Sequence, residues 1–191
     1  WVSSTAAAQH GPNGISFLLQ VTGPEPVPEP LAPVVLNEGS NGVPHSATIP
    51  GDTPLVVSPG FDGGSDGCEA YAPGALEGAI VVIRRGACPF SDKANNADAA
   101  GAVAVVIANN DTPGLIPSVP GTSIPVFGVN LADGNALRDF VWANPGATAM
   151  IGYPAVALPN PADALAASSS RGPAGNFDLV KPDVSAPGVQ I

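Results

Sequence analysis

The sequence predicts an α+β fold in which short strands dominate and two short helices interrupt them. Apolar residues make up 45% of the 191 residues, so the chain can bury a core. Gly and Pro number 23 each and separate apolar runs such as ISFLLQV and AIVVIRR, a pattern typical of short strands joined by tight turns. A strand–helix–strand pattern of about 30 residues in the middle predicts a βαβ unit with parallel strands and a right-handed crossover.

The first part of the chain contains mainly predicted strands. Residues 1–8, 15–21 and 54–58 have the apolar and β-branched composition of strands. The prolines of TGPEPVPEPLAP, residues 22–33, cannot donate to a sheet ladder, so this segment is expected to be a loop or an edge. The cluster FDGGSDGC, residues 61–68, predicts turns.

The central βαβ unit begins with a buried strand at residues 80–83 and returns with a strand at residues 103–108. Between them, Ser91 is the expected N-cap of a helix and Asp92 suits the positive end of its dipole. Small residues three apart form a stripe that can lie close to a sheet, at Ala94, Ala97 and Ala100. Gly101 then stands where the chain needs a positive φ to leave the helix.

A second helix is predicted after a strand at residues 123–130. Asp133 is its expected cap, Pro145 stops it, and the side chains expected to face inward are Leu137, Phe140 and Val141. Residues 148–153 read as a further strand, and the Pro-rich residues 154–166 as irregular structure. We find no internal repeat.

Charge and hydropathy exclude two classes of partner. The formal net charge is −10, from 16 acidic against 6 basic residues, whereas nucleic-acid binding needs clustered Lys and Arg. No apolar run approaches the roughly 18 residues that a membrane helix needs. We therefore expect no nucleic-acid partner and no membrane segment. The acidic surface and the 12% share of charged residues fit a soluble secreted protein.

The cysteines Cys68 and Cys88 suggest a disulfide. Two thiols and two distant histidines do not make an ordinary four-ligand zinc site, so no zinc is expected. A bridge between them would contribute about 3 kcal/mol of stability in the chain-entropy model. Two independent buried thiols are the alternative, because sequence alone does not determine pairing.

Two further sets of residues are candidates for metal binding and catalysis. Asp62 and Asp66 could ligate calcium, although turn formation explains both residues more simply. His10 and His45 both stand in turn-like contexts, and the chain has no G-x-S-x-G elbow. We therefore assign no catalytic residue and expect no cofactor beyond this calcium alternative.

The ends of the chain resemble the catalytic domain of subtilisin-like serine proteases (subtilases). WVSSTAAA, residues 1–8, looks like a strand of that family, and SSRGPAGNFDLVKPDVSAPGVQI, residues 169–191, looks like its S-S-R-G-P…K-P-D-V-x-A-P-G signature. Between them, residues 15–155 resemble a protease-associated (PA) domain, through Cys68, GAIVVIRRGACPF, KANNADAAGAVAVVIANN and IPVFGVNLADGNAL. The implied organisation is a PA domain at 15–155, with catalytic-domain flanks at 1–14 and 156–191.

The resemblance implies a non-catalytic segment of a secreted endopeptidase. In the family, the catalytic Asp and His and the oxyanion-hole Asn precede the first flank, and the nucleophilic Ser follows the second, so Ser185 is not the nucleophile. The PA-domain fold, with barrel-like or sandwich sheets, is implied in the same way. An inserted domain enters and leaves its host at nearly one place, so the segments near Ala6 and Ala166 are expected to lie close together.

The resemblance implies a role in binding: the domain would recognise protein or peptide substrates or control access to the active site. Its partners would be those substrates and the rest of the catalytic domain. A candidate partner-binding surface lies in the loop after the first βαβ strand, at Arg84, Arg85, Pro89 and Phe90. An equally good interpretation of this loop is a disulfide-tied connection with Phe90 packed inward. A structural or dimerisation module, and a self-contained hydrolase, are the alternative functions.

Overall fold

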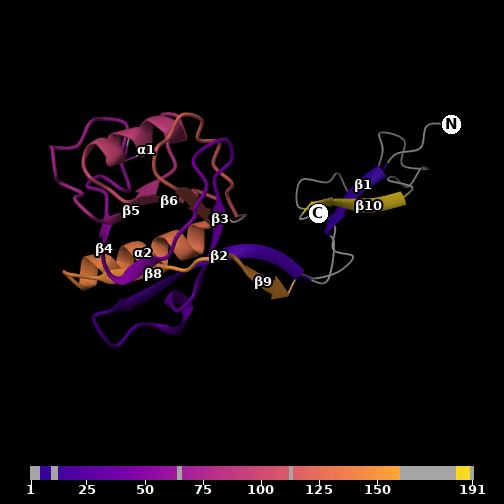
Figure 1. Ribbon diagram of the computed structural model, residues 1–191, viewed down its shortest axis with the longest axis horizontal. Helices are drawn as coiled ribbons and strands as arrows, with labels where there is room; N and C mark the ends of the chain where they lie inside the picture. Colours follow the sequence, from indigo (N-terminus) through magenta and orange to yellow (C-terminus); the bar gives the residue numbers. More distant parts are fainter. Residues whose placement is uncertain (1–4, 10–12, 64–65, 112–113, 160–183, 190–191) are drawn as a thin grey trace. The chain divides into compact units, whose positions relative to one another are not determined.

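A computed structural model describes residues 5–9, 13–63, 66–111, 114–159 and 184–189, and the side chains of 15–63, 66–111 and 114–158 (Figure 1). The chain divides into two compact units, Ser16–Ala155 and a second unit made of Trp1–Ile15 with Val156–Ile191. Within the described residues, no helix has the length and apolar character needed to cross a membrane.

The Ser16–Ala155 unit is built on a sheet that closes on itself. Its strands are β2 (Asn13–Gly23), β3 (Val34–Glu38), β4 (Ile49–Val57), β5 (Ile80–Arg84), β6 (Ala104–Ala108), β7 (Val126–Val129) and β8 (Thr148–Ile151). They follow the order β3-β7-β6-β5-β4-β8-β2, and an additional pairing of β2 with β3 closes the ring. The strand-dominated α+β class is therefore confirmed, and the sheet is of the barrel-like kind.

The parallel strands of this sheet are β4, β5, β6 and β7. The predicted βαβ unit is confirmed: β5 is followed by α1 (Phe90–Ala99), and β6 returns parallel to β5 with Ile80 opposite Ala104. Gly101 has the predicted positive φ of 97° and donates its N–H to the carbonyl of Asp98. Every residue of β5 and of β6 is buried, as in a sheet covered on both faces.

Both predicted helix caps were wrong. The first helix begins at Phe90, directly after an extended Pro89, so Ser91 lies inside the first turn. The cap position is therefore held by Pro89, which has no side-chain oxygen to accept a hydrogen bond, so no side chain caps this helix. The second helix, α2 (Leu131–Ala143), is capped by Asn130, whose Oδ1 accepts the N–H of Asp133 at 2.8 Å. Asn130 takes this role because β7 ends at Val129, which makes Asn130 the first residue at the turn.

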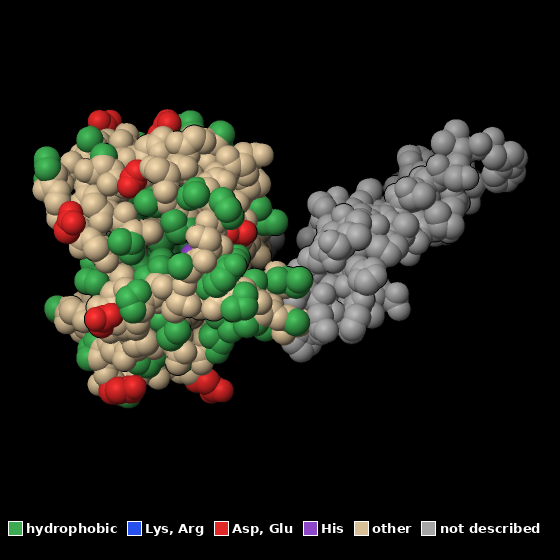
Figure 2. Space-filling view, in the orientation of Figure 1, with side chains coloured by type: hydrophobic (Ala, Val, Ile, Leu, Met, Phe, Trp, Pro, Cys, Tyr) green, Lys and Arg blue, Asp and Glu red, His purple; other side chains and the backbone are tan. Residues whose placement is uncertain are grey.

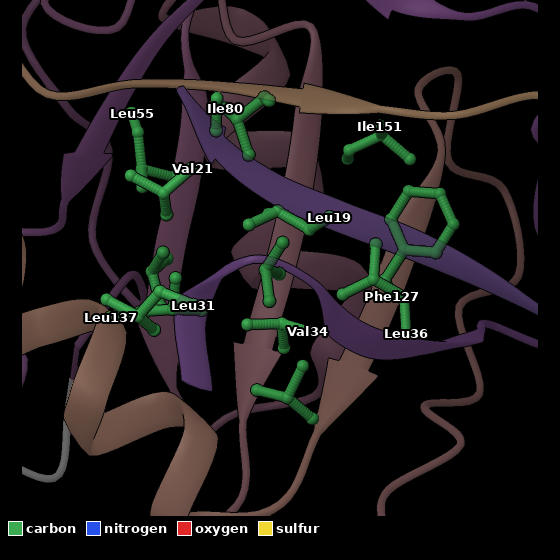
Figure 3. Packing of buried hydrophobic residues seen from close by; sticks show 14 of the residues in the cluster. Leu19, Val21, Leu31, Val34, Leu36, Leu55, Ile80, Phe127, Leu137 and Ile151 are labelled. Carbon is green, nitrogen blue, oxygen red and sulfur yellow. The ribbon is translucent and has the colours of Figure 1, made fainter. Parts of the chain in front are cut away.

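The two helices cover opposite faces of the parallel strands. Alternate residues of β5, Ile80 and Val82, join a core cluster that includes Leu137 of α2. Figure 3 shows this cluster, in which the other labelled side chains come mainly from the strands: Leu19, Val21, Leu31, Val34, Leu36, Leu55, Phe127 and Ile151. The other β5 residues, Val81 and Ile83, pack in a second cluster with Ala94 and Ala97 of α1. The small side chains of the predicted stripe thus allow α1 to lie close to the sheet.

Three elements departed from the sequence-based expectation. The Pro-rich segment contains a short 3-10 turn, η1 (Glu29–Leu31), whose Leu31 is buried, and it leads into β3, which was not predicted. Strand β4 begins at Ile49, earlier than the expected residue 54. A strand, β9 (Val156–Pro159), stands where irregular structure was expected.

The second unit contains a parallel pairing between two segments far apart in the sequence. Strand β1 (Thr5–Gln9) pairs with β10 (Val184–Val189), with Ala6 opposite Ser185. The first and last segments of the chain are therefore neighbours in space. The expected approach of Ala6 to Ala166 involves a residue outside the described part of the chain.

Candidate partner-binding site

Polar side chains gather where the parallel strands end. Ser58 follows β4, Arg84 is the last residue of β5, Asn109 follows β6 and Asn130 follows β7. The carboxyl ends of parallel strands meet at one edge of a sheet, and ligands of α/β sheets bind beyond that edge. This carboxyl edge is therefore the candidate location of a functional site.

Arg84 is a buried residue whose side chain connects several elements at the carboxyl edge. Its guanidinium donates from Nη1 to the carbonyl of Asn109 at 2.8 Å and from Nη2 to Oδ1 of Asn135 in α2. It also lies 4.2 Å from the centre of the Phe61 ring, and Nη2 is 3.7 Å from the carboxylate of Asp62. Burial lowers the pKa of Arg84, and the charge of Asp62 opposes that shift.

The prediction that Arg84 presents itself to a partner is therefore not supported, because the residue is only 8% exposed. Its neighbour Arg85 is exposed and donates to Oδ1 of Asn109 at 3.0 Å. Pro89 is also exposed, whereas Phe90 is half-buried against the α1 cluster. The structure thus favours the inward-packed interpretation for Phe90 and leaves Arg85 and Pro89 at the surface.

A second group of side chains, missed from the sequence, extends the edge outward along α2. Arg138 forms ion pairs with Asp62 at 3.1 Å and with Asp139 at 2.8 Å, and its guanidinium carbon lies 5.2 Å from the centre of the Trp142 ring. The bond to Asp139 raises the pKa of Arg138. Trp142 is 57% exposed. We call Trp142, Arg138 and Asp62 the tryptophan surface. The i, i+4 spacing of Arg138 and Trp142 in the sequence places these two side chains on the same face of the helix.

The loop that supplies Phe61 and Asp62 is tied down by a buried polar cluster. Asp66 accepts hydrogen bonds from the hydroxyl of Ser58 and, at 2.7 Å, from the N–H of Arg84, and the hydroxyls of Ser58 and Tyr71 are 2.7 Å apart. The ammonium of Lys93 donates to the carbonyl of Asp66. Burial raises the pKa of Asp66 and lowers that of Lys93, while their opposite charges act against both shifts.

A disulfide joins Cys68 to Cys88 and connects this loop to the start of α1. The pairing agrees with the one predicted. The bridge and the buried cluster together hold the loop against the parallel strands.

The two candidate calcium ligands have separate roles. Asp62 faces the guanidinium groups of Arg138 and Arg84, whereas the buried Asp66 accepts from Ser58 and the backbone. Among the described residues, no three His, Cys, Asp or Glu side chains are grouped to hold a metal ion. The contacts of both carboxylates fit loop organisation.

His45 lies in the core. It is 5% exposed, its ring contacts those of Phe17 and Phe127 edge-on, and its Nε2 is 3.3 Å from the carbonyl of Gly152. Figure 2 shows a histidine at the bottom of a hollow lined by hydrophobic side chains, with acidic side chains spread around this face. The other histidine, His10, lies outside the described residues.

The PA domain family model matches residues 52–137, which run from β4 into α2. The chain contains a PA domain. Its matched part includes the disulfide, the buried Asp66 cluster and the carboxyl edge up to Leu137.

Relatives of this PA domain chain are large proteases. It is 39% identical over 116 residues to the minor extracellular protease Vpr of Bacillus subtilis, covering 61% of this chain and 14% of that protein. It is 30% identical over 184 residues to the PI-type proteinase of Lactococcus lactis subsp. cremoris, covering 81% and 10%. It is 29% identical over 204 residues to the subtilisin-like protease SBT1.6 of Arabidopsis thaliana, covering 98% and 27%. The chain thus spans about a quarter or less of each, and its PA domain is of the kind carried by subtilisin-like proteases.

The fold also resembles solved aminopeptidase structures. A zinc aminopeptidase from Bacillus subtilis superposes with a TM-score of 0.50 at 24% identity, covering 84% of this chain and 35% of that one. An aminopeptidase from Aneurinibacillus sp. strain AM-1 gives a TM-score of 0.50 at 21% identity, covering 78% and 32%. The PA domain fold therefore accompanies more than one class of peptidase.

Proposed function

We propose that this chain is the non-catalytic PA domain segment of a secreted subtilisin-like serine endopeptidase, and that it binds the protein substrates of that enzyme at the tryptophan surface. Residues 15–155 form the domain in this proposal, and residues 1–14 and 156–191 belong to the catalytic domain that surrounds it. Catalysis belongs to parts of the parent enzyme beyond this chain.

The exposed ring of Trp142 carries the proposal. Trp and Arg are the residues that most often dominate the binding energy of protein interfaces. Trp142 is held in place by the guanidinium of Arg138, which Asp62 anchors in turn. A ring that is ordered before binding loses less conformational entropy when a partner covers it.

The closed sheet supports recognition by side chains. An extended peptide can bind a protein by adding a strand to a free sheet edge. Each strand from β2 to β8 already has a neighbour on both sides. The described strands of the closed sheet therefore offer no free edge to which a peptide strand could be added. The partner is instead bound by surface side chains such as those on α2.

The location of the parent enzyme is inferred from two observations. A disulfide persists mainly in oxidising compartments outside the cytosol. One of the similar proteases is named as an extracellular enzyme. Both support secretion, where protein substrates and the remainder of the catalytic domain are the partners.

The proposal is tested by binding of this chain to β-casein, an unfolded protein substrate, measured by biolayer interferometry. Replacing Trp142 by Ala is expected to weaken binding about tenfold or more, as at an interface hot spot. Val103→Ala is the matched control, because Val103 is an exposed apolar residue that precedes β6, at the other end of the parallel strands. That variant should bind like the wild type.

Three results would overturn the assignment. Casein could fail to bind the wild-type chain, or Trp142→Ala and Val103→Ala could weaken binding equally. A dimer in sedimentation that Trp142→Ala dissociates would assign the tryptophan surface to self-association.

A further inference from the structure

A completely buried lysine lies beside the disulfide. Lys93 of α1 is 0% exposed, and its Nζ is 3.8 Å from Sγ of Cys68. Lysine is almost never fully buried unless it is paired. Here the pairing is with the carbonyl of Asp66 and with the negative charge of the Asp66 carboxylate. The binding surface does not use this lysine, so its position needs a separate explanation.

The two sulfurs of the bridge have different surroundings. Cys68 is in the loop between Phe61 and Tyr71 and faces the Lys93 ammonium. Both cysteines are half-buried, and each stands beside exposed residues in the sequence. What distinguishes the two sulfurs is the Lys93 ammonium, which lies beside Cys68. A thiolate beside a lysine is stabilised, and the sulfur with the more stable thiolate leaves faster in thiol–disulfide exchange.

We propose that Lys93 makes the Cys68–Cys88 bridge a directional redox switch, in which an external dithiol attacks Cys88 and Cys68 departs. One thiolate of the dithiol forms a bond to Sγ of Cys88 while the Cys88–Cys68 bond breaks, and its electron pair goes to Cys68 as a thiolate facing Lys93. The second sulfur of the dithiol, as a thiolate, displaces Cys88, which takes up a proton. The dithiol is oxidised to its disulfide, and the bridge is reduced by two electrons.

The switch acts on the loop that holds the tryptophan surface. The bridge and Asn96, whose amide donates to the carbonyl of Gly67 at 3.0 Å, both connect α1 to this loop. Reduction removes one of these ties and loosens the segment carrying Phe61 and Asp62, the anchor of Arg138. That consequence rests on the proposed substrate-binding function, whereas the direction of bridge opening does not.

The direction is tested on the wild-type chain with reduced glutathione as a monothiol probe, followed by rapid alkylation with iodoacetamide. Peptide mass spectrometry should find glutathione on Cys88 and the alkyl group on Cys68 in most singly opened molecules. Glutathione mainly on Cys68, or equally on both, would overturn the proposal.

The role of the lysine is tested by the rate of reduction with dithiothreitol under native conditions. Lys93→Met removes the charge at similar size and is expected to slow reduction about tenfold, whereas Lys93→Arg keeps a cation and retains most of the rate. Asn96→Ala, which removes another tie between α1 and the loop but no charge, should not slow the reaction. An unchanged rate in folded Lys93→Met would refute the role of Lys93.

The glutathione experiment uses the wild-type chain, so it tests the direction of bridge opening even if the Lys93→Met variant does not fold. Casein binding separates the two proposals. If the oxidised wild-type chain does not bind casein, the proposed function fails and the direction of bridge opening still stands on the trapped products. If casein binds but the trapped products show attack on Cys68, only the redox proposal fails.

Discussion

The guanidinium carbon of Arg84 lies 4.2 Å from the centre of the Phe61 ring. Through this contact the last residue of β5 meets the loop that the disulfide holds. The same guanidinium reaches the carbonyl of Asn109 after β6 and the amide of Asn135 in α2. One buried side chain therefore joins two strand ends, a loop and a helix.

Replacing Arg84 by Met should destabilise the chain by about 2–3 kcal/mol, because the buried carbonyl of Asn109 and the half-buried amide oxygen of Asn135 would lose the hydrogen bonds of the guanidinium. Urea unfolding measures the loss. Arg84→Lys should recover only part of it, since an ammonium does not reproduce the planar fork of donors. The exposed neighbour provides the control: Arg85→Met should cost less than about 1 kcal/mol. Equal losses for the Arg84→Met and Arg85→Met variants would contradict the organising role of Arg84.

Gly134 allows α2 to approach β6 closely. A β-carbon at this position would stand 2.5 Å from the β-carbon of Ala108. Alanine is favoured over glycine in a helix by about 1 kcal/mol, so propensity alone predicts that Gly134→Ala stabilises the chain. We expect the opposite, a net loss of about 1–3 kcal/mol in denaturant unfolding, because the helix must move off the sheet.

The double variant Gly134→Ala with Ala108→Gly tests whether that clash is the cause. Removing the Ala108 β-carbon opens space for the new one, so the two changes together should cost less than the sum of the single changes. Strictly additive losses would show that the close approach of α2 to β6 is not responsible.

His45 should make stability depend on pH on the acid side. Burial lowers its pKa from the ordinary value of 6.5, against the opposing effects of the Gly152 carbonyl and Glu38. The unfolded chain therefore takes up the proton first, so the contribution of neutral His45 is complete above about pH 6.5 and is lost as the pH falls through the lowered value. The slope cannot exceed about 1.4 kcal/mol per pH unit for one group.

The slope assigned to His45 is isolated by the variant His45→Gln, which keeps a polar side chain without a proton equilibrium in this range. Thermal unfolding from pH 7.5 to 5 should show a steeper loss of stability in the wild type than in this variant. Parallel curves for the two proteins would mean that His45 titrates alike in the folded and unfolded chain.

Features that depend on local interactions could be predicted from the amino-acid sequence. The apolar run at residues 80–83, the alanine stripe of α1 and the positive φ of Gly101 all follow from side-chain type and spacing over a few residues. The bridge between Cys68 and Cys88 was expected from two cysteines in a chain of secreted type, and the structure decides against the alternative of two independent thiols. Charge and composition argued against nucleic-acid and membrane partners, whereas the expected protein partner came from the family resemblance.

Features that depend on contacts between distant parts of the chain could not be predicted from local sequence. Arg84 looks like a surface residue next to Arg85, yet its side chain is enclosed because Phe61 and Asn135 converge on it. The cap of α2 is Asn130 and not Asp133, because pairing with β6 determines where β7 ends. The Pro-rich segment leads into a strand because β2 and β7 supply partners for β3. The burial of Lys93 beside Cys68 has the same origin. Local sequence predicts only that Lys93 lies in a helix, whereas the contacts that enclose its ammonium come from a loop about 25 residues away in sequence.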